Sequence, residues 1–439
     1  MSLASLPLPL RRAVSPYTGI VRSLEECLCL TSEPPLFRAA CEVGRSDALL
    51  GASLDHLTGI GGAGLTRAEA LSAAVGEALE RYSATYVPQD RLVVATAEEL
   101  GDESVDPGRF ALFSERQLAS RGFPFARFGP ATRVSWIQGW SLPSGRPAWL
   151  PAELVFLRRP TQDGAACIGY ATSSGTACAS SLDDALCRGL CELLERDAFM
   201  IVWTNRLSLP LLDWSGSESI SALDRSLFAR VGLPYAAVDL SVFHRLPSVL
   251  GVARAGAGRR GALGVGAGTA SSVERALWKA LSEAFASRAA GVKLELLDPA
   301  AEYGHSGAGV ASFEDHIRYY ADPGRAAAAA FLDASPRRTP VASVPCLEPA
   351  SPAAHVAELC ERVEAAGSTA YAVDVTSPDV RELGLSVAKV LAPELCSLDV
   401  PHTARFLGGR RLYEAASVLG LREGPLAEHD VNPEPHPFP

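Results

Sequence analysis

A helical pattern that occurs three times constrains the fold of this chain more than any other feature. Residues 70–81 read ALSAAVGEALER and residues 185–196 read ALCRGLCELLER. Both begin with Ala-Leu, have a glutamate seven residues after that alanine, and end in Glu-Arg. A third copy, 276–285, keeps the alanine, the leucine and Glu283 but lacks the Glu-Arg pair. Copies this far apart in the sequence cannot stack as a solenoid. They instead predict one elaborate α/β (mixed α+β) domain that evolved by elaboration of an internal repeat.

A segment of small residues and a helix cap precede each copy. Thr66 with Glu69 three residues later has the capping-box spacing, Ser181 with Asp184 repeats it, and Ser271 or Ser272 is expected to cap the third helix. The predicted helices continue to Tyr82 or beyond in the first copy and cover 273–290 in the third. The Gly-rich segment 58–64 is predicted to be a turn, serving either as a backbone cradle for phosphate or as an ordinary turn of the core.

Helical geometry gives the first two copies an apolar face beside a charged face. At about 100° per residue, Glu80 and Arg81 lie on either side of Glu77, whereas the leucines and Val75 lie on the opposite arc. The same holds for Glu192, Glu195 and Arg196. Glu and Arg four residues apart are an ordinary surface pair on many helices. Two copies in the same register, each after a small-residue loop, instead favour a shared site.

Four carboxylates brought together repel one another unless cations neutralise them. Mg²⁺ suits such a site, because it binds through carboxylates together with substrate phosphates. Arginine supplies paired donors to phosphate oxygens. The sequence has no GxxxxGK[ST] loop. The pattern therefore predicts an Mg²⁺–nucleotide site that is built from helices rather than from a P-loop.

Composition excludes several other classes of protein. A net charge of -10 over 439 residues, without Lys or Arg runs, argues against a general nucleic-acid surface. No uninterrupted apolar run reaches the roughly 18–20 residues of a membrane span. Ten scattered cysteines and no signal peptide fit reduced thiols in the cytoplasm. The Cys27–Cys29 pair and the Cys187–Cys191 pair lack a nearby histidine pair, so both are predicted to be structural.

The rest of the chain alternates predicted strands and helices. Strands are expected at 91–96, 132–150, 233–250, 262–268, 370–375 and 386–391, a helix at 353–366, and a turn at 378–383. Residues 1–15 are expected to form a loose arm. The chain ends in PEPHPFP, where a proline at every second position favours an extended tail. The tail is either disordered or a rigid strut that delivers the Pro439 α-carboxylate as a general base.

Together these motifs resemble the YcaO family, and within it the azoline-forming cyclodehydratases of the D-protein type. The resemblance runs from about Ser15 to the C-terminus. It rests on the Gly-rich loop before ALERYSA, the TSSGTA loop before ELLERDAF, the third helix with Glu283 and Arg288, the YAVDVT strand at 371–376, and the alternating-proline terminus.

The resemblance implies an activity and a set of roles. Such enzymes use ATP and Mg²⁺ to convert Cys, Ser or Thr of a ribosomally made precursor peptide to thiazoline or (methyl)oxazoline. Carried over by position, Glu77, Glu80, Glu192 and Glu195 hold Mg²⁺, Arg196 and Arg288 contact phosphate, Arg81 and Glu283 support the nucleotide, and the Pro439 carboxylate is the catalytic base. Arg288 falls on the apolar arc of its helix, so its role requires the helix to end or bend before it. The implied domain covers 16–425 and the tail 426–439.

Three positions depart from the family pattern. Ala63 stands where Lys is usual, Ala73 where Ser is usual, and Ala286 where Gln is common. Each departure removes a polar contact near the nucleotide and leaves room for a noncatalytic ATP-binding scaffold. Backbone thioamidation or amidine formation is the alternative within the family. Because only about 15 residues precede the matching region, a separate E1-like or ThiF-like leader-binding partner is expected. An azoline dehydrogenase and a homodimer are also compatible with the resemblance.

Overall fold

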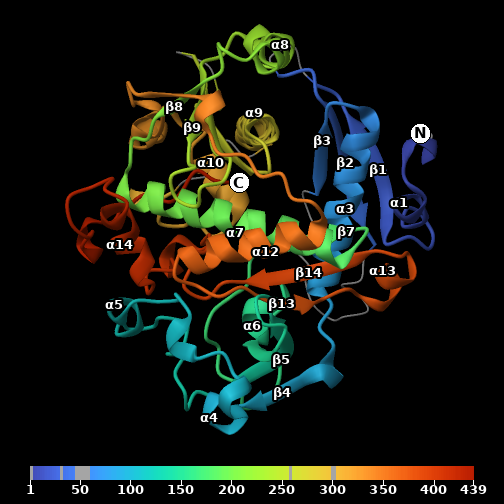
Figure 1. The fold of residues 1–439 in the computed structure, drawn as a ribbon, viewed down its shortest axis with the longest axis vertical. Coiled ribbons are helices and arrows are strands. Elements are labelled where there is room, and N and C mark those ends of the chain that lie inside the picture. The colour runs from blue at the N-terminus through green and yellow to red at the C-terminus, as the bar shows by residue number, and fades with distance from the viewer. Residues whose placement is uncertain (1–2, 30–32, 45–59, 257–259, 298–302) are drawn as a thin grey trace.

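Three separate sheets and a few long helices make up the structure, a computed structural model that describes residues 3–29, 33–44, 60–256, 260–297 and 303–439. Helix α7 (Leu182–Asn205) crosses the middle of the molecule in Figure 1, with α3 (Arg67–Thr85) to its right and α9 (Val273–Leu297) above it. The C-terminus lies near the centre of the same view. Within the described ranges, no helix is long and apolar enough to cross a membrane.

The first sheet consists of β1 (Val21–Cys27), β2 (Phe37–Val43) and β3 (Gly61–Gly64), all antiparallel. Helix α3 follows β3 and packs on the sheet. The predicted cap is present, since the Thr66 side chain accepts the Glu69 N–H and the Glu69 carboxylate accepts the Thr66 N–H. The described part of the Gly-rich segment is a strand rather than a turn, while Thr58 and Gly59 lie outside the described residues. Glycine is needed there because a Cβ on Gly62 would come within 2.3 Å of the Ala74 nitrogen.

The second sheet has the order β4-β5-β13-β14-β7, with β6 paired to β5. Its members are β4 (Leu92–Ala95), β5 (Val134–Ser141), β6 (Pro147–Pro151), β7 (Thr176–Ala179), β13 (Tyr371–Asp374) and β14 (Ser386–Leu391). Helix α7 follows β7, packs against β14, and is covered by α12 (Pro352–Ala365). Ser181 caps α7 as predicted, accepting the Asp184 N–H.

The third sheet has the order β11-β10-β9-β8-β12. Its members are β8 (Leu211–Asp213), β9 (Tyr235–Asp239), β10 (Ser248–Arg254), β11 (Leu263–Thr269) and β12 (Arg338–Pro340). Helix α9 follows β11 and packs along β10 and β11. It continues to Leu297, beyond the predicted end at residue 290.

The sequence repeat is a structural repeat of strand and helix. The Glu77 carboxylate accepts the N–H of Gly61, 16 residues earlier on β3, at 3.3 Å. The Glu283 carboxylate accepts the N–H of Ala267, also 16 residues earlier, at 2.8 Å on β11. The α3 helix also touches β7, and α7 also touches β11. The three units therefore lie side by side, with their repeat helices adjoining.

Two local expectations differ from the structure. The expected loose arm contains the short helices η1 (Leu3–Ser5) and α1 (Leu8–Arg12), and Leu6 is buried in the core beside α3. The turn expected at 378–383 is the short helix α13 (Pro378–Glu382), with its proline in the first turn, where no N–H is required. The remaining α-helices are α4 (Ala97–Leu100), α5 (Glu115–Leu118), α6 (Ala152–Val155), α8 (Glu218–Leu227), α10 (Phe313–Tyr319), α11 (Pro323–Ala326) and α14 (Arg410–Val418).

Candidate active site

The repeat helices bring their glutamates together as two acidic groups. Glu77 and Glu80 of α3 and Glu192 of α7 act on one another electrostatically and form the first group. Glu195 of α7 and Glu283 of α9 form the second. Carboxylates that lie more than a hundred residues apart in the chain therefore share one region between the three helices.

In the first group, burial leaves negative charge poorly compensated. Glu77 has an ion pair with Arg81 at 2.7 Å. Glu80 accepts the backbone N–H of Cys178 on β7. Burial, followed by the carboxylates of Glu192 and Glu77, raises the pKa of Glu80 well above its ordinary value. Burial also raises the pKa of Glu77, against the opposing charge of Arg81. An added cation would lower both pKa values.

In the second group, Arg196 and Lys279 both form ion pairs with Glu195. Glu195 is fully buried, with one oxygen 2.7 Å from Arg196 and the other 3.2 Å from the Lys279 ammonium. Burial raises the pKa of Glu283, although Arg196 and Lys279 oppose the shift. Lys279 occupies, in the third repeat, the place that Ala73 occupies in the first, since each side chain lies beside the equivalent glycine of the preceding strand.

Arg196 connects the two acidic groups. Its guanidinium reaches Glu192 at 3.2 Å and Glu195 at 2.7 Å. Burial alone would lower the pKa of Arg196, but the carboxylates of Glu195, Glu192 and Glu283 outweigh it and raise the pKa. Its Nε is buried and has no hydrogen-bond partner among the described residues. A donor of this kind leaves one N–H for an anionic oxygen such as that of a phosphate.

The structure does not contain a finished metal cage. Among the described ranges, no three His, Cys, Asp or Glu side chains converge closely enough to hold a metal ion. The residues nevertheless fit Mg²⁺, because it prefers hard carboxylate oxygens and would neutralise the buried carboxylates of Glu77, Glu80 and Glu283, whose pKa values burial raises. The assignment of Glu77, Glu80, Glu192 and Glu195 to particular ions stays a prediction.

Arg81 and Arg288 have different surroundings. Arg81 lies in the first group through Glu77. Arg288 donates to the backbone carbonyl of Arg260 at 3.0 Å, and its Cβ lies against β11. Helix α9 neither ends nor bends before Arg288, which was the condition for its phosphate role. This geometry points one Nη of Arg288 to the backbone, and its contact with phosphate stays a prediction.

Lys389 is a charged residue of the site that the sequence reasoning missed. It is the single charged residue of strand β14, it is buried, and it donates to the carbonyls of Thr172 and Ser174 at 2.7 and 2.6 Å. Burial lowers its pKa to about 8, and the carboxylates of Glu192 and Glu80 oppose the shift. A lone lysine among buried strand residues was the signal that could have revealed it.

The C-terminal tail is ordered and ends at this cluster. Phe438 is fully buried against Phe199, with ring centroids 4.9 Å apart, and the Arg196 guanidinium lies over its ring at 4.1 Å. The disordered alternative for the tail is therefore wrong. Pro439, the last residue, follows directly and is half-buried. Its neighbour Phe438 is the residue that stacks on Arg196.

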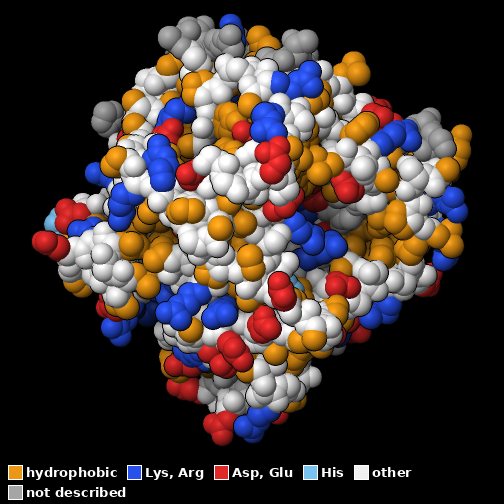
Figure 2. Space-filling view, turned by 45° about the horizontal axis from the view of Figure 1, so that its top comes forward, with side chains coloured by type: hydrophobic (Ala, Val, Ile, Leu, Met, Phe, Trp, Pro, Cys, Tyr) orange, Lys and Arg blue, Asp and Glu red, His pale blue; other side chains and the backbone are white. Residues whose placement is uncertain are grey.

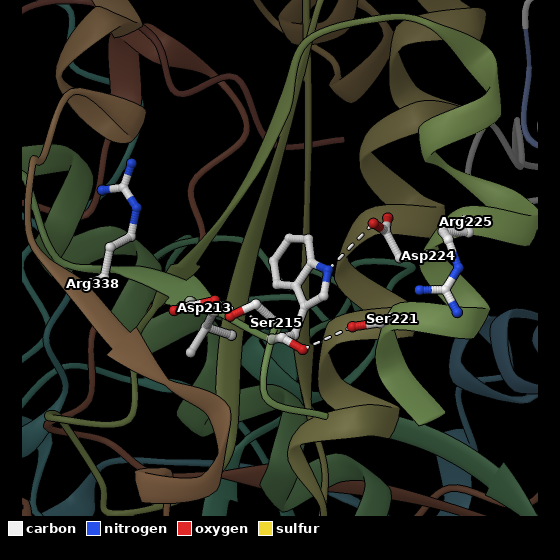
Figure 3. Close-up of a pocket in the computed structure, with 8 residues that line it drawn as sticks. Asp213, Ser215, Ser221, Asp224, Arg225 and Arg338 are labelled. Carbon is white, nitrogen blue, oxygen red and sulfur yellow. Dashed lines mark hydrogen bonds between the residues drawn. The ribbon is translucent and has the colours of Figure 1, made fainter. Parts of the chain in front are cut away.

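The structure has a cavity beside the acidic groups and a pocket away from them. A small cavity of about 60 Å³ is lined by Arg196, Lys389 and apolar side chains that include Leu112, Tyr170 and Phe406. A more open pocket, shown in Figure 3, shares no lining residue with the acidic groups. There Trp214 donates to Asp224, and Ser221 donates to the Trp214 carbonyl.

Comparison with known proteins decides the family. The YcaO cyclodehydratase family, described as ATP- and Mg²⁺-binding, matches residues 61–396. The chain belongs to the YcaO family. Its mixed α/β fold and the binding of ATP and Mg²⁺ are those of the family.

Several relatives of this YcaO protein are informative. A heterocyclase solved in complex with substrate and cofactor has a TM-score of 0.79 and 25% identity, over 98% of this chain and 57% of its own. The YcaO protein of Methanopyrus kandleri, bound with AMPPCP and Mg²⁺, shares the fold at a TM-score of 0.59 and 19% identity, over 87% of each chain. An uncharacterised protein of Methanothermobacter thermautotrophicus is 30% identical over 231 residues, which are 52% of this chain and 56% of that protein. The chain therefore spans little more than half the length of the first and third of these relatives.

Acidic and basic side chains are mixed on the surface. Figure 2 shows Lys and Arg side chains interspersed with Asp and Glu over the face it presents, without one continuous basic surface.

Proposed function

We propose that this YcaO protein is an ATP-dependent cyclodehydratase that converts Cys, Ser or Thr residues of a ribosomally made precursor peptide to thiazoline or (methyl)oxazoline. One observation carries the proposal. The buried end of the chain stacks Phe438 on Arg196, the arginine that also pairs with both acidic groups. This arrangement supports a site where a phosphoryl donor and a terminal carboxylate act on the same peptide bond.

Each group has a role in the proposed reaction. The Pro439 carboxylate removes the proton from the side-chain thiol or hydroxyl as that group attacks the preceding amide carbon. The carbonyl oxygen becomes the oxygen of a hemiorthoamidate. ATP supplies the phosphoryl group that turns this oxygen into a leaving group. Phosphate then departs with the former amide oxygen, the amide nitrogen loses its proton, and a C=N bond completes the ring.

The chain's own residues would hold the phosphoryl donor. Glu77, Glu80, Glu192 and Glu195 would bind Mg²⁺. Arg196 would donate its Nε–H, which has no partner within the described part of the chain, to a phosphate oxygen. Lys279, which already forms an ion pair with Glu195, would offset the negative charge of the second acidic group. Lys389 would hold the loop that contains Thr172 and Ser174 against the site.

Partners are part of the proposal. YcaO cyclodehydratases commonly depend on an E1-like or ThiF-like protein that binds the leader of the precursor peptide, and we expect such a protein here. The ten cysteines are free in the structure, which suits a reducing cytoplasm.

Intact-mass spectrometry tests the proposal. Candidate precursor peptide, leader-binding partner, ATP and Mg²⁺ are incubated with the protein, and the peptide mass is followed. Cyclodehydration predicts the loss of one water mass per modified residue. Replacement of oxygen by sulfur would indicate thioamidation, and the absence of any mass change with a proven partner would favour the noncatalytic scaffold.

A further inference from the structure

The last residues of the chain lie in a buried cage. They contact α7, α10 and the segment 399–405 through hydrogen bonds from Trp203, His316, Tyr319, Tyr320 and Arg405. The Tyr320 hydroxyl donates to the Pro435 carbonyl at 2.5 Å, and Tyr319 donates to the Glu434 carboxylate at 2.6 Å. These hydrogen bonds hold residues 432–436 in place.

His316 is the member of this cage with an unusual hydrogen-bond pattern. Its Nδ1 lies 2.6 Å from the His436 carbonyl oxygen, and its Nε2 lies 2.8 Å from the Val400 carbonyl oxygen. A carbonyl oxygen only accepts hydrogen bonds, whereas a neutral imidazole has only one N–H. Both contacts are satisfied only when both nitrogens carry protons. The buried His316 ring is therefore an imidazolium.

The neighbouring groups are compatible with a cation at this place. Burial raises the pKa of Asp399, against the opposing charges of Arg405 and His316, and this carboxyl group lies 3.6 Å from Arg405. His436, stacked on His316 at 4.0 Å, is neutral, because its Nδ1 accepts the Phe438 N–H and its Nε2 donates to the Asp399 carbonyl. Burial and the neighbouring His316 lower the pKa of His436 well below its ordinary value.

The remaining charged and titratable neighbours do not compete for the proton. Burial, then Arg405 and His316, lower the pKa of His402 to about 4, so this ring is neutral too. Glu434 adds a second carboxylate to the cage through its bond from Tyr319. The cage thus holds two cations, His316 and Arg405, and two carboxylates, Asp399 and Glu434.

A short chain of contacts connects His316 to the acidic site. His316 binds the His436 carbonyl, and the His436 ring accepts the Phe438 N–H at 3.2 Å. The Phe438 ring in turn lies against Arg196 at 4.1 Å. We propose that His316, held as an imidazolium, is a positioning residue that fixes the tail so that the Pro439 carboxylate meets the reacting peptide bond. The role of that carboxylate rests on the proposed function, whereas the charge of His316 and the anchoring of the tail do not.

Nuclear magnetic resonance of protein labelled with ¹⁵N-histidine tests the charge directly, without peptide or ATP. We expect one buried ring in which both nitrogens resonate at the protonated position at neutral pH. The resonances are assigned to His316 by their loss in His316→Gln, or in the wild type by through-space contacts to the stacked His436 ring. A His316 ring with one unprotonated nitrogen at neutral pH would overturn the proposal.

Hydrogen–deuterium exchange tests the anchoring. In His316→Gln the side-chain amide can replace only one of the two ring contacts, so one buried carbonyl loses its charged donor. We expect exchange of the C-terminal peptide that contains Phe438 to rise roughly ten- to a hundredfold. Mg²⁺–ATP binding should change less than twofold. The matched control is His429→Gln, which alters an exposed ring nearby in the chain and should leave tail exchange unchanged.

Two results separate the possible failures. If tail exchange in a folded His316→Gln protein equals that of the wild type, His316 does not position the tail. If His316 is doubly protonated and the tail loosens as expected, but the wild type never cyclises a peptide, the positioning inference holds and the proposed function fails. If His316→Gln does not fold, the wild-type ¹⁵N spectrum still decides the charge, and His316→Asn measured by the same exchange experiment decides the anchoring.

Discussion

Extending the chain beyond Pro439 tests the role of the terminal carboxylate separately from the contacts that anchor the tail. Two glycines added after Pro439 convert that carboxylate to a peptide bond and leave Phe438 and its contacts intact. Pro439 is half-buried rather than sealed in the core, so the extension can leave toward solvent. The variant therefore removes a base without removing the anchor.

The expected magnitude follows from the geometry of the tail. A positioned general base contributes typically 10²- to 10⁴-fold to a rate, so we expect the extended variant to lose about that much in kcat for cyclisation. Deleting Pro439 instead leaves a carboxylate on Phe438 but draws it back by about 3 Å, the rise of one residue in an extended proline helix. Since a misplacement of about 1 Å can cost on the order of 10²-fold, this variant should be similarly slow.

The assay compares two quantities in the same preparations. Peptide cyclisation is followed by mass spectrometry, and Mg²⁺–ATP binding is followed by calorimetry. Both variants should bind Mg²⁺–ATP within about threefold of the wild type, because Arg196 and the acidic groups are untouched, while cyclisation collapses. Cyclisation by the extended variant at the wild-type rate would refute the assignment of the carboxylate as base.

Three other changes have definite expected outcomes. Glu192→Gln should abolish ATP turnover, because it removes a carboxylate from the Mg²⁺ cluster, and a phosphate-release assay showing near-normal turnover would remove the metal assignment. Asp197→Asn should lower the free energy of unfolding by about 3–5 kcal/mol, because it breaks a buried ion pair with Arg411 at 2.8 Å. Glu414→Gln, which breaks the exposed ion pair with Arg410, should lower it by less than about 1 kcal/mol in the same urea titration. Because the pKa of Glu80 is raised, Mg²⁺ must displace its proton, so Mg²⁺ binding should release protons and strengthen as the pH rises. Calorimetry in buffers of different ionisation enthalpy should detect the released protons. The number of protons released should be smaller in Glu80→Gln.

The sequence was sufficient to predict the repeat helices because their signals are local. Thr66 with Glu69 and Ser181 with Asp184 form the expected caps, and the 3.6-residue period places the glutamates on one side of each helix. The strands at 370–375 and 386–391 were also predicted. These features depend on neighbours within about four residues, which a single sequence contains in full.

The features that sequence reasoning missed depend on long-range packing. Nothing near Arg288 in the chain shows that its guanidinium reaches the Arg260 carbonyl, 28 residues away. Lys389 becomes part of the site only because β14 pairs with β7. The cation at His316 is visible only once the His436 carbonyl, 120 residues away, lies against its ring. Periodicity and caps contain no information about such contacts.

An isotope-transfer experiment tests the central claim most directly. The backbone carbonyl that precedes the cyclised residue is labelled with ¹⁸O, and the inorganic phosphate released from ATP is examined by mass spectrometry. If the amide oxygen leaves as phosphate, each ring formed yields one phosphate with a single ¹⁸O. Rings that form while the released phosphate stays unlabelled would show that ATP does not activate the amide oxygen, and would contradict the proposed role of the site around Arg196.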